Sequence, residues 1–152
     1  MNINSYSYRL LGTSEPLGQL QKSVEKAFHA RSFKLFWRYW NPLLGYILSK
    51  YIYKPLSKIM SDRISTILTF IFSGLILHDS WFMPLCYFVF KKPVFFPVTI
   101  IFFCFGIVSV AEDSLKLRDH IENDKVHVLI NMIYIFGISI AGGLISALMY
   151  KY

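Results

Sequence analysis

The 152-residue chain is strongly apolar, with 55% hydrophobic, 18% aromatic and only 16% charged residues. These proportions exclude an ordinary soluble domain and a disordered chain, and they predict an all-α integral membrane protein with several spans. The net charge of +7 comes from residues 1–63, which hold ten Lys/Arg against three Asp/Glu, because residues 64–152 hold six of each. Such a basic block favours the cytoplasmic side and anionic membrane lipids, and its mixing with aromatic residues argues against nucleic acid as a partner.

Residues 1–63 are expected to form a cytoplasmic or interfacial region. Thr13 and Ser14, followed by Pro16, predict a helix start. From Leu17 to Phe28, apolar residues recur at helical spacing while lysines occupy the other faces. The pattern predicts a basic amphipathic helix at the membrane surface, although a soluble helix that packs on a partner would show the same pattern.

An aromatic segment, residues 33–40, leads to Asn41 and Pro42. The apolar stretch that follows, residues 43–53, is shorter than the roughly 20 residues that a membrane-crossing helix needs. We expect it to be a tilted, interfacial or re-entrant helix that ends at Pro55.

Residues 64–152 are expected to form the transmembrane region, with about three transmembrane or re-entrant helices at 64–90, 93–111 and 128–150. The first segment either crosses once or divides near Ser73 or His78 into two shorter pieces. If it crosses once and the N-terminal region is cytoplasmic, Lys91 and Lys92 lie on the far side, against the positive-inside tendency.

Two further patterns concern the last span and the polar link before it. Small residues at Ser139, Gly143 and Ala147 predict close internal helix packing, with a dimer face as the alternative. In the link 112–127, His120 lies at helical spacing from Asp124 and His127, as metal ligands would, but a solvated loop is favoured and no metal is expected.

The clearest functional candidate is His78, within the apolar run 64–90. A charged side chain at membrane depth costs roughly 2.5 kcal/mol or more, so an ionisable group there usually has a function. A neutral imidazole can act as a general base toward a hydroxyl, whereas the alternative is a neutral His that is hydrogen-bonded to a neighbouring helix. Asp79 either contributes to the same site or caps a helix break.

Asn41 carries an amide donor that could bind a developing oxyanion, although Asn before Pro is also common in turns. The cations that precede it, Arg31, Lys34 and Arg38, could bind the phosphates of a cofactor or could anchor an interfacial helix.

The order of three motifs resembles the membrane-bound O-acyltransferase family. SFKLFWRYWN (32–41) precedes YIYKPL (51–56), and an apolar helix with FSGLILHD (72–79) follows. The family has an aromatic segment ending in His or Asn, a short Tyr/Pro-Leu element and a membrane-embedded His after SGL. The resemblance covers residues 31–80 and corresponds to the C-terminal catalytic half of the family. SGLILHD has one more residue before its His than the usual motif, and Leu77 replaces the customary Trp.

The resemblance implies acyl transfer from a thioester donor such as acyl-CoA to a hydroxyl of a lipid, sugar or alcohol acceptor. His78 matches the catalytic histidine and Asn41 the second catalytic polar position. The positions that would bind donor or substrate are Trp37, Arg38, Trp40, Ser73 and Asp79. The expected partners are membrane lipids and the hydroxyl-bearing acceptor, and a second copy of the chain or a partner membrane subunit could complete the site.

Two other interpretations stay open at this point. The chain could be a non-enzymatic membrane subunit of the same family that binds a partner through its small-residue stripe. It could also be a small proton-coupled transport component in which His78 and Asp79 form a polar site.

Overall fold

A computed structural model describes residues 3–91 and 97–149, and every regular element in those ranges is helical. This confirms the all-α prediction. The N-terminal part contains α1 (Ile3–Leu11), α2 (Pro16–Phe28), α3 (Phe33–Trp40), α4 (Pro42–Leu48), a π-helical turn η1 (Ser49–Tyr53) and α5 (Lys54–Leu56). The C-terminal part contains α6 (Asp62–Phe72), a second π-helical segment η2 (Ser73–Asp79), α7 (Ser80–Phe90), α8 (Pro97–Leu115) and α9 (Asp124–Met149).

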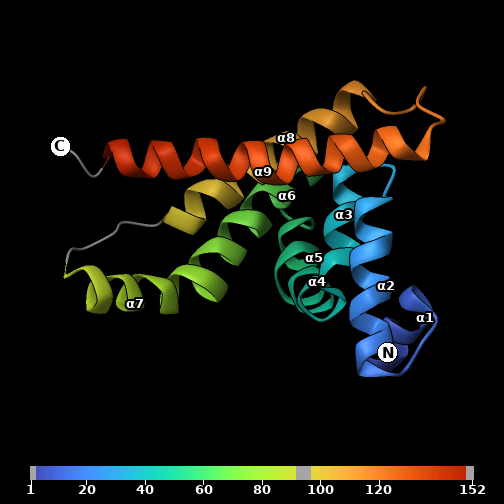
Figure 1. Cartoon of the computed structure of the whole chain (residues 1–152), viewed down its shortest axis with the longest axis horizontal. Helices are drawn as coiled ribbons and strands as arrows, with labels where there is room; N and C mark the ends of the chain where they lie inside the picture. The colour runs from blue at the N-terminus through green and yellow to red at the C-terminus, as the bar shows by residue number, and fades with distance from the viewer. Residues whose placement is uncertain (1–2, 92–96, 150–152) are drawn as a thin grey trace.

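Three helical stretches are long and apolar enough to cross a membrane, which are Asp62–Val89, Val98–Leu115 and Asp124–Met149. By length and composition the chain therefore has the helices of a multi-pass membrane protein. Figure 1 shows α9 along the long axis of the molecule, with α8 against it, while α2 runs across that direction. Such a crosswise orientation suits a helix at the membrane surface.

The first span is one helical run that includes η2, so it is neither divided nor folded into a hairpin. It ends in α7, which lies at the opposite end of the molecule from the α8–α9 link (Figure 1), and Lys91 is the C-cap of α7. This continuous helix is the alternative in which residues 64–90 form one long segment and not two shorter pieces.

The expectation that a helix ends at Pro55 is wrong, because helical geometry continues to Leu56. The π-helical turn explains the difference. The backbone N–H of Lys54 donates to the carbonyl of Ser49, five residues earlier. Pro55 then falls at the start of a new α-helical turn, where its missing N–H leaves no intrahelical bond broken.

Close helix approach in α9 uses a different register from the one predicted. A Cβ on Gly142 would lie 2.6 Å from a side-chain carbon of Ile101 on α8, whereas a Cβ on Gly143 would have nothing within 4 Å. Gly142 and Ser146 are buried, and Ala147 is exposed. The predicted internal packing of Gly143 and Ala147 is therefore wrong by one position, because Gly142 and Ser146 are the small residues that this part of α9 buries.

The buried core joins α3 to the spans. Phe33 and Phe36 have no exposed surface, and they form one cluster with Phe102 and Phe105 of α8. The rings of Phe33 and Phe105 lie 5.6 Å apart in an edge arrangement. An aromatic segment that composition alone would place at the headgroups is thus partly a core element.

A buried polar network anchors the turn between α2 and α3. The Glu112 carboxylate accepts the backbone N–H of Phe33 at 2.7 Å and pairs with Arg118 at 2.8 Å. Asn131 receives a hydrogen bond from Arg118 and donates to the carbonyls of Phe28 and Ala30. These side chains satisfy backbone groups that the helix ends leave open. The link that was expected to be solvated therefore contains buried side chains.

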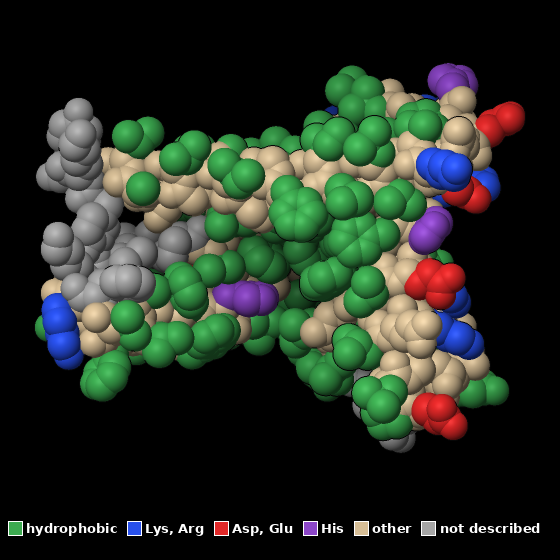
Figure 2. Space-filling view, viewed as in Figure 1, with side chains coloured by type: hydrophobic (Ala, Val, Ile, Leu, Met, Phe, Trp, Pro, Cys, Tyr) green, Lys and Arg blue, Asp and Glu red, His purple; other side chains and the backbone are tan. Residues whose placement is uncertain are grey.

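Charged side chains gather at one end of the molecule, over the N-terminal helices and the α8–α9 link, while apolar side chains cover most of the rest of the visible face (Figure 2). Arg31 lies 3.8 Å from Asp124, and Lys34 lies 3.8 Å from Asp113. The basic N-terminal region and the link thus lie on the same side of the three spans.

Candidate functional site

A cavity of about 650 Å³ lies between the N-terminal helices and the spans. Its volume is within the range of small-molecule sites. Aromatic and aliphatic side chains form most of its walls, with a few polar groups among them. The lining residues are Tyr6, Lys34, Trp37, Arg38, Trp40, Asn41, Leu44, Gly45, Leu48, Ser49, Tyr53, Thr66, Thr69, Phe70, Ser73, His78, Phe102, Phe105, Ile135 and Ser139. Six of the seven predicted site residues are in this set.

His78 enters the cavity from η2. Its Nδ1 lies 2.9 Å from the carbonyl oxygen of Ser73. Because a carbonyl only accepts, Nδ1 carries the proton and, in the neutral ring, Nε2 keeps its lone pair. Within the described residues Nε2 has no hydrogen-bond partner. The ring is therefore held by one nitrogen and has a free basic nitrogen at the cavity.

The π-helical geometry explains this contact. In a π-helix the chain pairs residues five apart, so the Ser73 carbonyl lies where a ring five positions later can reach it. The face of the ring packs on Phe102, with centroids 4.7 Å apart. Phe102 in turn contacts Trp37, with centroids 5.4 Å apart. One apolar wall therefore connects His78 to the aromatic segment of α3.

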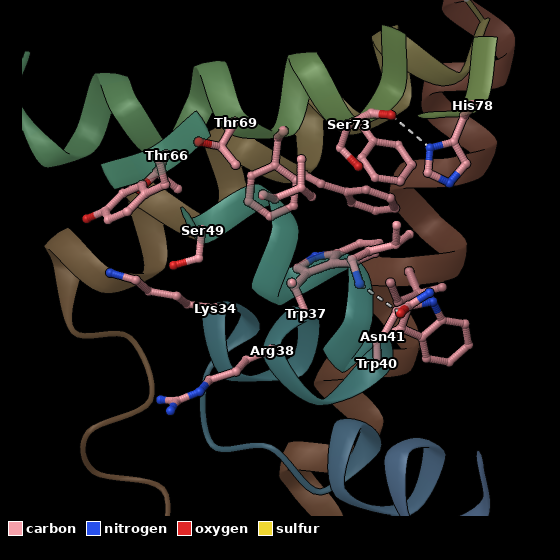
Figure 3. A pocket seen from close by; sticks show the side chains of 18 of the residues that line it. Lys34, Trp37, Arg38, Trp40, Asn41, Ser49, Thr66, Thr69, Ser73 and His78 are labelled. Atoms are coloured by element: carbon pink, nitrogen blue, oxygen red, sulfur yellow. Dashed lines mark hydrogen bonds between the residues drawn. The ribbon is translucent and has the colours of Figure 1, made fainter. Parts of the chain in front are cut away.

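Asn41 lies between α3 and α4, and its side chain caps α4. The Oδ1 atom accepts the backbone N–H of Leu44 at 3.1 Å. That bond fixes the orientation of the amide, because an N–H requires an acceptor. The Nδ2 donor has no partner among the residues that the structure describes. Figure 3 shows Asn41 and His78 at the same end of the cavity, on opposite walls.

Two cations, Lys34 and Arg38, line the other end of the cavity in the same view (Figure 3). Lys34 is ion-paired with Asp113, with 3.8 Å between Nζ and Oδ2, and both side chains are exposed. Arg38 has no ion pair in residues 3–91 and 97–149. Tyr53 also lines this cavity, and burial, followed by the nearby Asp62 carboxylate, raises the pKa of its phenol. The cavity is thus polar and basic at one end and apolar along its walls.

The remaining predicted residues lie in different places. Trp37, Trp40 and Ser73 line the cavity, and the indole N–H of Trp37 is buried without a hydrogen-bond partner in the described chain. Asp79 does not line it. The Asp79 carboxylate accepts the backbone N–H groups of Val98 and Thr99 and the hydroxyl of Thr99. Asp79 therefore caps the start of α8, so the expectation that it contributes to the site or caps a break in its own helix is wrong, because the helix is continuous at Asp79 and the carboxylate reaches a neighbouring helix.

Several lining residues have no counterpart in the sequence-based site. Phe102, Phe105, Ile135 and Ser139 come from α8 and α9, which reach the cavity only through the packing of the spans. The neighbourhoods of Phe102, Phe105 and Ile135 are apolar, so no local signal marks these residues, and Ser139 was expected only to pack helices together. Thr66 and Thr69 lie seven and four positions before Ser73, so a helical projection from Ser73 could have placed them on the same face.

The spacing of His120, Asp124 and His127 does not produce a metal site. His127 is buried, with Nε2 3.0 Å from the Ile121 carbonyl oxygen, and Asp124 faces Arg31. In residues 3–91 and 97–149, no group of three metal-ligating side chains is close enough to hold an ion.

The fold has the three long apolar helices of a multi-pass membrane protein, and the cavity with His78 lies between them and the N-terminal helices. Comparisons of the chain with protein-family models, curated proteins and solved structures gave no match. Any functional assignment must therefore come from the residues and their arrangement.

Proposed function

We propose that the chain is a membrane-bound O-acyltransferase, or the histidine-bearing part of one, which moves an acyl group from a thioester donor such as acyl-CoA to a hydroxyl. The observation that carries the proposal is that His78 and Asn41, thirty-seven positions apart in the sequence, line one cavity. The same two residues are the ones that the family resemblance singles out.

The free Nε2 of His78 supports a role as general base. In the proposed reaction the acceptor O–H gives its proton to Nε2 as its oxygen attacks the thioester carbonyl carbon. The C–S bond of the resulting intermediate then breaks. The leaving thiolate takes the proton from the imidazolium, which restores the neutral ring and releases a thiol beside the new ester.

The Nδ2 donor of Asn41 supports a role in binding the oxyanion that forms on the thioester carbonyl. Its partner atom Oδ1 is already engaged by Leu44, so the donor is fixed before substrate arrives. A donor that needs no reorganisation is what stabilises charge in a transition state. Arg38 and Lys34 would attract an anionic donor such as acyl-CoA, with Trp37 and Trp40 shaping the site.

The charge distribution supports a cytoplasmic location for the N-terminal region, because the basic helices and the α8–α9 link lie on the same side of the spans (Figure 2). The cationic end of the cavity would then open toward the compartment that contains acyl-CoA.

The test is acyl transfer from radiolabelled acetyl-CoA and palmitoyl-CoA to membrane lipids and glycans, with wild type and His78→Ala at matched expression. His120→Ala is the matched control, because His120 is exposed and lies outside the cavity. We expect incorporation that is lost in His78→Ala and kept in His120→Ala. Incorporation that survives in His78→Ala would contradict the proposal.

A second candidate is a non-catalytic membrane subunit, which the open surface at Gly137 and Gly143 favours. A Cβ at either position would meet nothing within 4 Å. Small residues on a lipid-facing helix permit a neighbouring span to approach closely. In that case acyl transfer by a complex would depend on Gly143 and would not depend on His78.

A further inference from the structure

A second, smaller cleft of about 260 Å³ adjoins the cavity. Two tyrosines, a serine and two lysines line it, namely Tyr6, Tyr46, Ser49, Lys50 and Lys54. Tyr6 and Ser49 line the large cavity as well. A ligand could therefore occupy the cleft with one end and the cavity with the other.

The cleft carries positive charge that no carboxylate balances. Lys50 and Lys54 lie four positions apart in one helical run, and neither is ion-paired within residues 3–91 and 97–149. In contrast, Arg31, Lys34 and Arg118 each face a carboxylate. Two like charges at this spacing repel each other, so an anion between them would be stabilising.

Aromatic residues hold the Lys50 ammonium group at the cleft. Its Nζ lies 5.0 Å from the ring centroid of Tyr51 and 5.6 Å from that of Tyr46. The side-chain interaction with Tyr51, followed by those with Tyr46, raises the pKa of Lys50. The group therefore stays charged in the presence of its neighbours. The Ser49 hydroxyl adds a further donor to the lining.

Exposed aromatic residues near the cleft and the adjoining cavity indicate what kind of anion reaches the cleft. Tyr51 is 60% exposed and Trp40, in the same series of short helices, is 42% exposed. Exposed Trp and Tyr side chains favour the level of the lipid headgroups. At that level the abundant anion is the phosphate of a lipid.

We infer that the cleft binds the phosphate group of a lipid and that the rest of this lipid extends into the adjoining cavity toward His78. The inference deepens the proposed function, on which it rests for the role of His78. It assigns the hydroxyl acceptor to the class of phosphate-bearing lipids with a free hydroxyl. Lys50 and Lys54 are the phosphate ligands, and Ser49 and Tyr6 lie where the headgroup meets the cavity.

The test is a binding measurement on the purified full chain in a detergent with an uncharged headgroup. The probes are 1-oleoyl-glycerol 3-phosphate and 1-oleoyl-glycerol, which differ only in the phosphate. The variants are Lys50→Gln/Lys54→Gln and the control Lys58→Gln, which removes a nearby exposed lysine that does not line the cleft. Circular dichroism verifies that each variant is folded.

We expect the phosphate-bearing lipid to bind at least about tenfold more tightly than its neutral counterpart. The double variant should lose this preference, and Lys58→Gln should keep it. Equal affinities for the two lipids in wild type would overturn the inference, as would an equal loss in Lys58→Gln. Displacement of the lipid by equimolar coenzyme A or inorganic phosphate would assign the site to a soluble phosphate and would also overturn it.

Turnover is measured separately so that the two proposals fail in different ways. A phosphate preference without His78-dependent acyl transfer would leave the lipid site standing and contradict the catalytic proposal. His78-dependent transfer without a phosphate preference would support the catalytic proposal and contradict the lipid site.

Discussion

The ring nitrogen Nδ1 of His78 lies 2.9 Å from the carbonyl oxygen of Ser73, within the same helical run. The contact selects one tautomer, so a neutral His78 should carry its proton on Nδ1. Nitrogen NMR of protein labelled with ¹⁵N in its histidine rings distinguishes the two tautomers. We expect one resonance set with a protonated Nδ1 to disappear in His78→Gln. If the resonance set that disappears has a protonated Nε2, the tautomer inferred for His78 is wrong.

Asp79 should matter for stability through its contacts with α8. Its carboxylate accepts hydrogen bonds from Val98 and from both the backbone and the hydroxyl of Thr99. Asp79→Ala leaves these donors open in a buried place, which should cost about 1–3 kcal/mol of unfolding free energy. The measurement is an SDS titration followed by circular dichroism.

The control for Asp79 is Asp113→Ala, which removes an exposed ion pair with Lys34. Exposed pairs contribute about 1 kcal/mol or less. A loss in Asp79→Ala no larger than in Asp113→Ala would show that the cap contributes little. The loss of unfolding free energy in Thr99→Val should lie between the losses in Asp79→Ala and Asp113→Ala, because Thr99→Val removes one of the three donors to Asp79.

The buried pair of Glu112 and Arg118 predicts a larger effect. Both side chains are less than 5% exposed, so Arg118→Met leaves a carboxylate buried without its partner. Breaking such a pair costs about 3–5 kcal/mol. Arg31→Met is the matched control, because Arg31 and Asp124 are mostly exposed. The same titration compares them, and similar losses in the two variants would contradict a buried network.

The sequence predicted the three spans because their apolar runs are long and uninterrupted. It also predicted that Asn41 and His78 lie near each other, since the motif order connected them, and both residues line one cavity. It did not predict the place of Asp79, because adjacent residues on a helix point in different directions and hydropathy does not indicate which neighbour each one meets. The Glu112 network was missed for a related reason. Its partners are backbone groups of residues 27–33, and every residue type has such groups, so the sequence does not indicate which of them are paired.

Gly142 and Gly143 form a matched pair for the packing of α9. A Cβ at Gly142 would come within 2.6 Å of Ile101, whereas one at Gly143 has open space. Gly142→Ala should therefore cost about 1–3 kcal/mol through overpacking. Gly143→Ala should be neutral or stabilising by up to about 1 kcal/mol, because Ala favours a helix. Thermal unfolding in detergent measures both, and a larger loss at Gly143 would contradict the register of α9.

Asn41 permits a separation of its structural and chemical roles, because its two amide atoms have different partners. Asn41→Asp keeps an oxygen that can accept the Leu44 N–H, so it preserves the cap on α4 but removes the Nδ2 donor. Asn41→Ala removes both. If Nδ2 binds the oxyanion, both variants should lose about 10²–10³-fold in kcat.

Stability should distinguish the same two variants. Asn41→Ala loses the cap and about 1 kcal/mol, whereas Asn41→Asp should retain nearly all of the wild-type unfolding free energy. An Asp variant with wild-type turnover would exclude Nδ2 as the oxyanion donor. An Asp variant that is stable but inactive would not be explained by a purely structural role, because it keeps the cap on α4 and changes only the cavity-facing donor, which becomes a carboxylate oxygen.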